Sequence, residues 1–209
     1  MIKAIIFDIG NVLLPFDFSV ALQKLRQKSG VEPVGEAMEA VKLAYESGRI
    51  GRTEFLEKMR SALDYSGTEA EFVAAWEDIF TENVAMSDLV RELHGKYPLF
   101  LLSNTNDLHM DYVFRKFPAF ALFKDAVFSH RVKGFKPGRE IYEIALRQFG
   151  VKAEETVFID DLQANVDAAQ ELGFHAIRYD YNRHDDLLRE LSAMGVQAGA
   201  GNREPSGLA

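Results

Sequence analysis

Apolar residues along this chain follow two patterns, short continuous runs and a helical repeat. The change from one pattern to the other indicates how the chain is organised. Short continuous runs of β-branched and aromatic residues are bounded by polar or turn-forming residues. Such runs are typical of strands that are buried on both faces of a parallel sheet. The runs expected to form strands are 5–7, 99–102, 126–128, 156–159 and 175–179.

Residues 16–80 contain only the helical period. Apolar residues recur three and four positions apart in four successive segments, which predicts four amphipathic helices with no strand between them. Thr53 is a plausible N-cap for the third helix. Thr68 and Glu71 have the spacing of a capping box ahead of the fourth. Four consecutive helices indicate one separate helical unit.

After Phe80, helices alternate with strands, and Pro137 is predicted at the first position of one helix. The alternation predicts an α/β fold, a doubly wound (Rossmann-like) parallel sheet with right-handed crossovers and an inserted four-helix cap. We expect an α/β core at 1–15 and 81–197, a helical cap at 16–80 and a flexible tail at 198–209. An insertion after the first strand lies above the carboxyl edge of the sheet, where it can act as a lid.

Composition narrows the classes of function. The net charge is -8, and no basic stripe stands out, which argues against a nucleic-acid partner. There is no cysteine, so disulfides and zinc–thiolate sites are excluded and a reducing cytoplasm fits best. The first apolar run stops at Asp8, too early for a signal peptide, and no segment is long enough to span a membrane. The oligomeric state is left open.

Polar residues follow the predicted strands at points that meet on one edge of a parallel sheet. Asp8 follows the first strand, Ser103 and Asn104 the second, Lys136 lies beyond the third, and Asp160 with Asp161 follows the fourth. Ligands bind beyond the carboxyl ends of such strands. Three carboxylates without a Cys or His cluster suit Mg²⁺, and Ser103 with Lys136 suits a phosphate group.

The motifs FDIGNVLL, LLSNTN, GFKPGREIY and VFIDDLQANVDAA, in this order, resemble the four motifs of the haloacid dehalogenase-like (HAD) hydrolase superfamily. The resemblance covers about residues 2–180 and includes a C1-type helical cap. Within the superfamily, the wording of the first two motifs is similar to the bacterial alpha-D-glucose-1-phosphate phosphatase group. The resemblance implies a Mg²⁺-dependent phosphomonoesterase that acts on a small phosphorylated metabolite, predicted to be a sugar phosphate.

The resemblance also implies residue roles. Asp8 is the expected nucleophile, which forms an aspartyl-phosphate that water then hydrolyses. Ser103, Asn104 and Lys136 are expected to bind the phosphoryl group, with Lys136 also holding Asp8. The expected Mg²⁺ ligands are Asp8, the backbone carbonyl of Gly10 and Asp161, with Asp160 as the second choice because it is expected to orient Lys136 or the metal-bound waters.

Gly10 departs from the superfamily pattern, in which a second Asp two residues after the nucleophile serves as general acid and base. Such assistance is worth about 10² to 10⁴ in rate. A sugar 1-phosphate needs leaving-group protonation less than a simple alcohol ester does. Candidates for a substitute donor are Asp17, His109 and His130, each more often a surface or capping residue.

Two alternatives stay open. A metal-free 2-haloacid dehalogenase also uses an Asp nucleophile without the second acid, but Asp160 and Asp161 are then uncompensated negative charges. A non-catalytic or weakly catalytic phosphate-binding module, similar to a receiver domain, also fits the absence of an acid at Gly10. The cap does not name a substrate, and Arg49 and Tyr45 are candidates to face the site.

Overall fold

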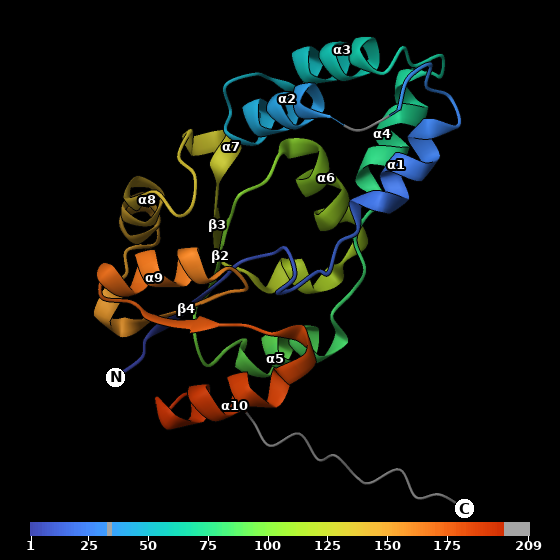
Figure 1. The fold of residues 1–209 in the computed structure, drawn as a ribbon. Helices are drawn as coiled ribbons and strands as arrows, with labels where there is room; N and C mark the ends of the chain where they lie inside the picture. The colour runs from blue at the N-terminus through green and yellow to red at the C-terminus, as the bar shows by residue number, and fades with distance from the viewer. Residues whose placement is uncertain (33–34, 199–209) are drawn as a thin grey trace, which may run out of the picture.

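A five-stranded parallel sheet forms the centre of the computed structural model, which describes residues 1–32 and 35–198. The strand order is β3-β2-β1-β4-β5, and every neighbouring pair is parallel. Figure 1 shows helices on both sides of this sheet. The predicted α/β, doubly wound fold is thereby confirmed. The strands are β1 (Ala4–Phe7), β2 (Leu99–Ser103), β3 (Asp125–Phe128), β4 (Thr156–Asp160) and β5 (His175–Arg178).

Successive side chains of each strand point to opposite faces of the sheet, and both faces are covered. Ile5 and Phe7 pack into one apolar cluster with helices α5, α6 and α10. Ala4 and Ile6 pack into a second cluster with α8 and α9. All four are buried, as the continuous apolar run predicts. The helices are α5 (Val84–Leu93), α6 (Asp107–Lys116), α8 (Arg139–Phe149), α9 (Gln163–Glu171) and α10 (His184–Ala193).

The segment between β1 and β2 begins with four helices that form a cap, at the top of Figure 1. They share an apolar cluster in which Phe55, Phe72 and Trp76 are buried and in ring contact. The capping box of Thr68 and Glu71 is confirmed. The cap helices are α1 (Phe18–Arg26), α2 (Glu36–Glu46), α3 (Arg52–Ala62) and α4 (Glu69–Glu77).

Two predicted helix starts are wrong. Thr53 is not an N-cap, because the carbonyl of Gly51 accepts the first helical hydrogen bond, from Phe55 N at 2.9 Å. Pro137 does not open α8, because a hydrogen bond from Gly138 N to Phe135 O closes a tight turn around it. Short elements that the sequence did not predict are η1 (Pro118–Leu122), α7 (Ser129–Val132), η2 (Ala153–Glu155) and η3 (Tyr181–Arg183).

The domain boundaries near residues 15, 80 and 197 stay a prediction. Val196 is buried in the core beside α10, so the chain packs on the sheet up to that point. Of the predicted tail, 199–209 lie outside the described residues. Within 1–32 and 35–198, no helix has the length and apolar character to cross a membrane.

Candidate active site

Three neighbouring strands carry the polar side chains that the sequence places at the sheet edge. Asp8 directly follows β1, Ser103 is the last residue of β2, and Asp160 is the last residue of β4. Because β1 lies between β2 and β4, these strand ends are adjacent. Lys136 comes from the loop between α7 and α8. The fold therefore brings together the residues predicted from the strand ends.

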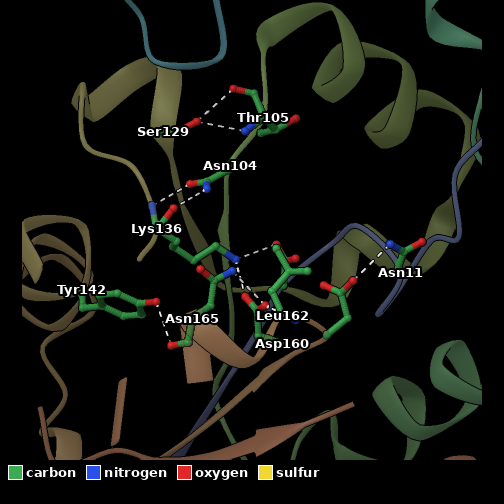
Figure 2. Close-up of polar contacts among 11 residues, drawn as sticks. Asn11, Asn104, Thr105, Ser129, Lys136, Tyr142, Asp160, Leu162 and Asn165 are labelled. Atoms are coloured by element: carbon green, nitrogen blue, oxygen red, sulfur yellow. Dashed lines mark hydrogen bonds and ion pairs between the residues drawn. The ribbon is translucent and has the colours of Figure 1, made fainter. Parts of the chain in front are cut away.

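Lys136 is a buried cation between two carboxylates. Its side chain is only 1% exposed, and Nζ lies 2.9 Å from Asp8 Oδ1 and 2.6 Å from Asp160 Oδ2. Figure 2 shows the Lys136 amine directed toward Asp160. Burial disfavours the charged amine, but the attraction of both carboxylates outweighs it and raises the pKa of Lys136. Lys136 is therefore a fixed positive charge at this edge.

Asn104 holds the backbone of Lys136. Its Nδ2 donates to Lys136 O at 2.9 Å, and Lys136 N donates to Asn104 Oδ1 at 2.9 Å (Figure 2). This paired contact ties the end of β2 to the lysine loop. Asn104 thereby fixes the position of the backbone at Lys136.

Asp160 and Asp161 have different surroundings. Asp160 is fully buried and accepts from Leu162 N and Asn165 Nδ2, both at 2.9 Å, in addition to Lys136. Asp161 is partly buried, and among the described residues it accepts one side-chain hydrogen bond, from Asn11 Nδ2 at 3.1 Å. Asp160 is thus fully engaged in holding the lysine and the start of α9. The less engaged Asp161 has oxygen atoms to offer to another group.

The acidic cluster suits a divalent cation. Asp8, Asp160 and Asp161 each offer an oxygen within 4.8 Å of the others. Asp8 Oδ1 is buried and, within the described chain, receives no hydrogen bond of good geometry although Lys136 is near. Burial raises the pKa of Asp8 to about 6 against the pull of Lys136, and the charge of Asp160 adds to the rise. Burial also raises the pKa of Asp161. Three carboxylates beside one ammonium make an oxygen-rich site with excess negative charge, which fits Mg²⁺.

A cavity adjoins this edge on the side of the cap. Its apolar part is formed by residues of the cap, of the segments joining it to the core and of α6, which are Ile9, Phe16, Phe18, Ile79, Phe80 and Met110. The remaining lining residues are Gly10, Glu46, Ser103, Asn104, Thr105 and His109. The cavity thus joins the predicted phosphate-binding residues to a mainly aromatic pocket with a few polar groups.

Phe16 occupies the space where a side chain at position 10 would lie. A Cβ added to Gly10 would meet Phe16 Cε1 at 2.9 Å. Phe16 is 39% exposed and makes edge contacts with Phe18 and Phe80. The space that an acidic side chain at position 10 would need is therefore filled by the aromatic ring of Phe16, which lies in the segment between β1 and the cap.

Gly10→Asp is expected to lower the free energy of unfolding by about 1–3 kcal/mol, because the new side chain must displace the Phe16 ring. In a Phe16→Ala background the same change should cost little. Urea denaturation of the two single variants and the double variant measures this coupling. Purely additive effects would show that the ring does not oppose a side chain at Gly10.

The candidates for a substitute proton donor differ in their surroundings. Asp17 is exposed and caps α1, and its pKa is lowered by its hydrogen bonds with Ser19. His109 is buried, with Nδ1 3.1 Å from Asn106 Nδ2 and Nε2 3.2 Å from Trp76 O. Burial lowers the pKa of His109 to about 4, so the ring is neutral at pH 7. His130 Nδ1 lies 2.9 Å from Thr105 O, and the ring does not line the cavity.

Arg49 and Tyr45, which the sequence allows to face the site or equally to lie at the surface and in the core, take the second arrangement. Tyr45 is buried, stacked on Phe55, and its hydroxyl donates to Asp107. Arg49 is exposed, and its Nε donates to Ser47 Oγ at 2.9 Å. Neither residue lines the cavity.

Four polar residues around the site were not among the predicted site residues. Asn165 is buried beside Asp160, and a polar residue on the otherwise apolar face of the 163–171 helix is a signal for it. Asn11 has φ +53°, a left-handed backbone that Asn tolerates, and directs its amide to Asp161. Ser129 and Glu46 carry no sequence signal that separates them from other polar residues.

Several known proteins are similar to this chain in sequence or in structure. A D-ribitol-5-phosphate phosphatase of Bacteroides thetaiotaomicron is 27% identical over 85% of this chain and 92% of its own. A sesquiterpene phosphatase of Aspergillus oryzae is 30% identical over 82% of this chain and 86% of its own. A HAD family enzyme of Bacteroides thetaiotaomicron, solved in complex with magnesium and inorganic phosphate, superposes with a TM-score of 0.77 at 27% identity, covering 88% of this chain and 96% of that one.

The likeness to alpha-D-glucose-1-phosphate phosphatases stays a prediction. The wider assignment is shown, because the family model described as haloacid dehalogenase-like hydrolase matches residues 2–173. With its parallel sheet, its helical cap and this match over most of its length, the chain belongs to the haloacid dehalogenase-like hydrolase family.

Proposed function

We propose that this chain, a HAD-type phosphatase with Mg²⁺ as its cofactor, hydrolyses a small phosphorylated metabolite, a sugar or polyol phosphate, through an aspartyl-phosphate on Asp8. The observation that carries the proposal is the buried contact of Lys136 with Asp8, at 2.9 Å, beside two further carboxylates. A fixed cation next to a strand-end carboxylate suits the transfer of a negatively charged phosphoryl group.

In this mechanism a carboxylate oxygen of Asp8 attacks phosphorus and water later releases the phosphate. Lys136 neutralises charge on Asp8 and on the phosphoryl oxygens as they approach each other. The hydroxyl of Ser103, at the buried end of β2 beside Asp8, donates to a phosphoryl oxygen. Asn104 positions Lys136 through its paired backbone contact and offers its own N–H to the phosphate.

Asp8, Asp161 and the backbone carbonyl of Gly10 are the groups we assign to Mg²⁺. Asp160 is the positioning residue for Lys136, because its oxygens already accept three hydrogen bonds. When bound, the cation neutralises phosphate charge and orients the ester for in-line attack. The ligand set contains only oxygen atoms, as this ion prefers.

The lining of the cavity suits a leaving group that has both apolar and polar parts. Aromatic side chains line one part, whereas Thr105 offers a polar group for hydroxyls. The two phosphatase relatives act on a polyol phosphate and on a sesquiterpene ester, according to their names. A sugar or polyol phosphate is our proposal because Thr105 adds a polar group to this pocket and one of these relatives is named for a polyol phosphate.

Two alternatives have less support. Metal-free dehalogenation leaves the three clustered carboxylates, the partly buried Asp161 among them, with the ammonium of Lys136 to balance them. A non-catalytic phosphate-binding module agrees with the missing acid at Gly10, but it gives no role to the polar groups in the cavity.

Removal of divalent cations with EDTA is expected to reduce phosphate release to background, because the three carboxylates then repel the phosphate. Added Mg²⁺ should restore the rate. The measurement is phosphate release from ribitol 5-phosphate, glucose 1-phosphate, other sugar phosphates and nucleotides.

Three results would oppose the proposal. Full activity after chelation would contradict the role of the cation. Halide release from a 2-haloacid in EDTA would favour the dehalogenase. Stable BeF₃⁻ binding without turnover of any ester would favour the non-catalytic module.

A further inference from the structure

We infer that Glu46 of the cap is the catalytic proton donor and acceptor of this enzyme, in place of the side chain that Gly10 lacks. Glu46 is the last residue of α2, and it lines the same cavity as Gly10 and Ser103. The inference rests on the proposed phosphatase function. It assigns to a cap residue the proton transfers that hydrolysis of an alkyl phosphate requires.

Gly10 carries no proton donor, and a side chain at this position would have to displace the Phe16 ring. The Phe16 ring fills the volume next to Gly10, 2.9 Å from where its Cβ would be. An acid that serves the leaving group must therefore reach it from another wall of the cavity. Glu46 is the one carboxylate among the described lining residues.

Two contacts fix the Glu46 end of α2 on the core domain. The Ser129 hydroxyl donates to Glu46 O at 2.5 Å, and Ser129 Oγ itself accepts from Thr105 N at 2.9 Å. Figure 2 shows the Ser129 and Thr105 contact close to the end of β2. Thr105 is two residues beyond Ser103, so the backbone of Glu46 is tied to the loop that begins at the phosphate-binding end of β2.

The second contact lies two residues further along the cap. Gly48 has φ +67°, and a Cβ there would meet His130 O at 2.2 Å. Only glycine allows this close approach of cap and core backbones. The loop after α2 is therefore seated on α7, and Glu46 keeps a defined place at the cavity.

The side chain of Glu46 is free to act. Within the described residues its carboxylate has neither a hydrogen bond nor a salt bridge, whereas both ring nitrogens of His109 in the same cavity have partners. Burial raises the pKa of Glu46 to about 7, which Lys42 opposes and Glu39 assists. A carboxylic acid with this pKa can exchange its proton at neutral pH.

On the described parts of the neighbouring elements, the charged and titratable groups that face this part of the cavity are neutral or have partners, and Asp107 of α6 accepts from the Tyr45 hydroxyl. From α6, His109 is neutral at pH 7. From α7, His130 has a pKa lowered by burial. From α3, Arg52 is held by Asp111 at 2.9 Å. Within α2, Lys42 pairs with Glu39 at 3.0 Å.

The chemistry balances in two steps. In the first, an Asp8 oxygen bonds to phosphorus, the bond from phosphorus to the ester oxygen breaks, and protonated Glu46 gives its proton to the departing alkoxide. In the second, Glu46 carboxylate takes a proton from water as the water oxygen bonds to phosphorus and the Asp8 oxygen leaves. Phosphate, the alcohol and the original protonation state of Glu46 result.

The test compares wild type with Glu46→Gln on two esters. One is an alkyl phosphate that wild type hydrolyses, and the other is p-nitrophenyl phosphate, whose leaving group needs no proton. Loss of general acid and base help is expected to slow alkyl phosphate turnover by about 10² to 10⁴. With p-nitrophenyl phosphate, the variant should release one equivalent of p-nitrophenol in a fast burst and then turn over slowly, because only water activation is lost.

The pH dependence gives an independent readout. Alkyl phosphate turnover by wild type should fall as pH rises through about 7, since Glu46 then loses the proton it must donate. Turnover of p-nitrophenyl phosphate limited by water attack should rise through the same range. In Glu46→Gln, neither the fall of alkyl phosphate turnover nor the rise of p-nitrophenyl phosphate turnover should be seen in this pH range.

The control is Glu57→Gln, an exposed glutamate of α3 without a salt bridge in the described chain. It should match wild type. A higher KM for the alkyl phosphate with unchanged kcat and pH dependence would overturn the inference and make Glu46 a hydroxyl-binding residue. Equal losses of turnover on both esters, without a burst of p-nitrophenol, would also overturn the inference and assign a structural role to Glu46. If wild type hydrolyses neither ester, the proposed function itself fails.

Discussion

Asp8→Asn is expected to reduce phosphate release by roughly 10³-fold or more, because an amide cannot form the aspartyl-phosphate and loss of a nucleophile removes the covalent path. The replacement has the same shape, and Lys136 keeps its 2.6 Å contact with Asp160. Stopped assays of phosphate release, with Mg²⁺ present, measure the change. Equal rates for wild type and variant would show that Asp8 is not the nucleophile.

The stability of Asp8→Asn separates a chemical effect from unfolding. Burial raises the pKa of Asp8 to about 6, above its ordinary 3.8, so the ionised carboxylate opposes folding at higher pH. Without Mg²⁺, the variant should therefore be at least as stable as wild type at pH 8, and the difference should shrink as pH falls below 6. Asp64→Asn, at an exposed cap position, is a matched control that should keep full activity.

Lys136→Met is expected to lower the free energy of unfolding by about 3–5 kcal/mol at pH 8, because Asp8 and Asp160 then lose the cation between them. Methionine fills a similar volume, so the loss is electrostatic. The rate should also fall by about 10² to 10³, the usual effect of removing one charge-stabilising donor. Urea denaturation and phosphate release measure the two effects.

The pH dependence of the stability of Lys136→Met shows whether its stability loss is electrostatic. Without the ammonium, the attraction that lowers the pKa of Asp8 is lost and its folded-state pKa rises further, so the variant gains stability as pH falls from 8 to 5. Lys152→Met, at an exposed position, should show neither effect. A stability loss in Lys136→Met that is the same at pH 5 and pH 8 would point to packing instead.

Much of the fold was predictable because its signals are local. Ile5, Ile6 and Phe7 form a continuous apolar run that only a strand covered on both faces accommodates, and both faces are covered. The predicted helix starts at Thr53 and Pro137 were wrong because the exact start of a helix depends on contacts outside the local pattern. Several residues there can begin a helix, and contacts of the surrounding turn select one.

The core of the site was predictable because topology brings strand ends together. Parallel strands place their carboxyl ends on one edge, so Asp8, Ser103 and Asp160 become neighbours wherever the strands run in this order. Their order and motif wording also identify the family. Asn165 and Ser129 were missed, because their importance lies in the groups that they contact.

The residues themselves therefore establish the sheet, its acidic edge and the presence of Lys136 at that edge, because these follow from runs, spacing and strand direction. Only the tertiary structure decides what replaces the side chain missing at Gly10. Phe16 fills that space, and Ser129 together with Gly48 seats the end of α2 on the core, so that Glu46 lines the cavity. These contacts join parts of the chain that no periodic pattern relates, because the packing of cap on core sets them.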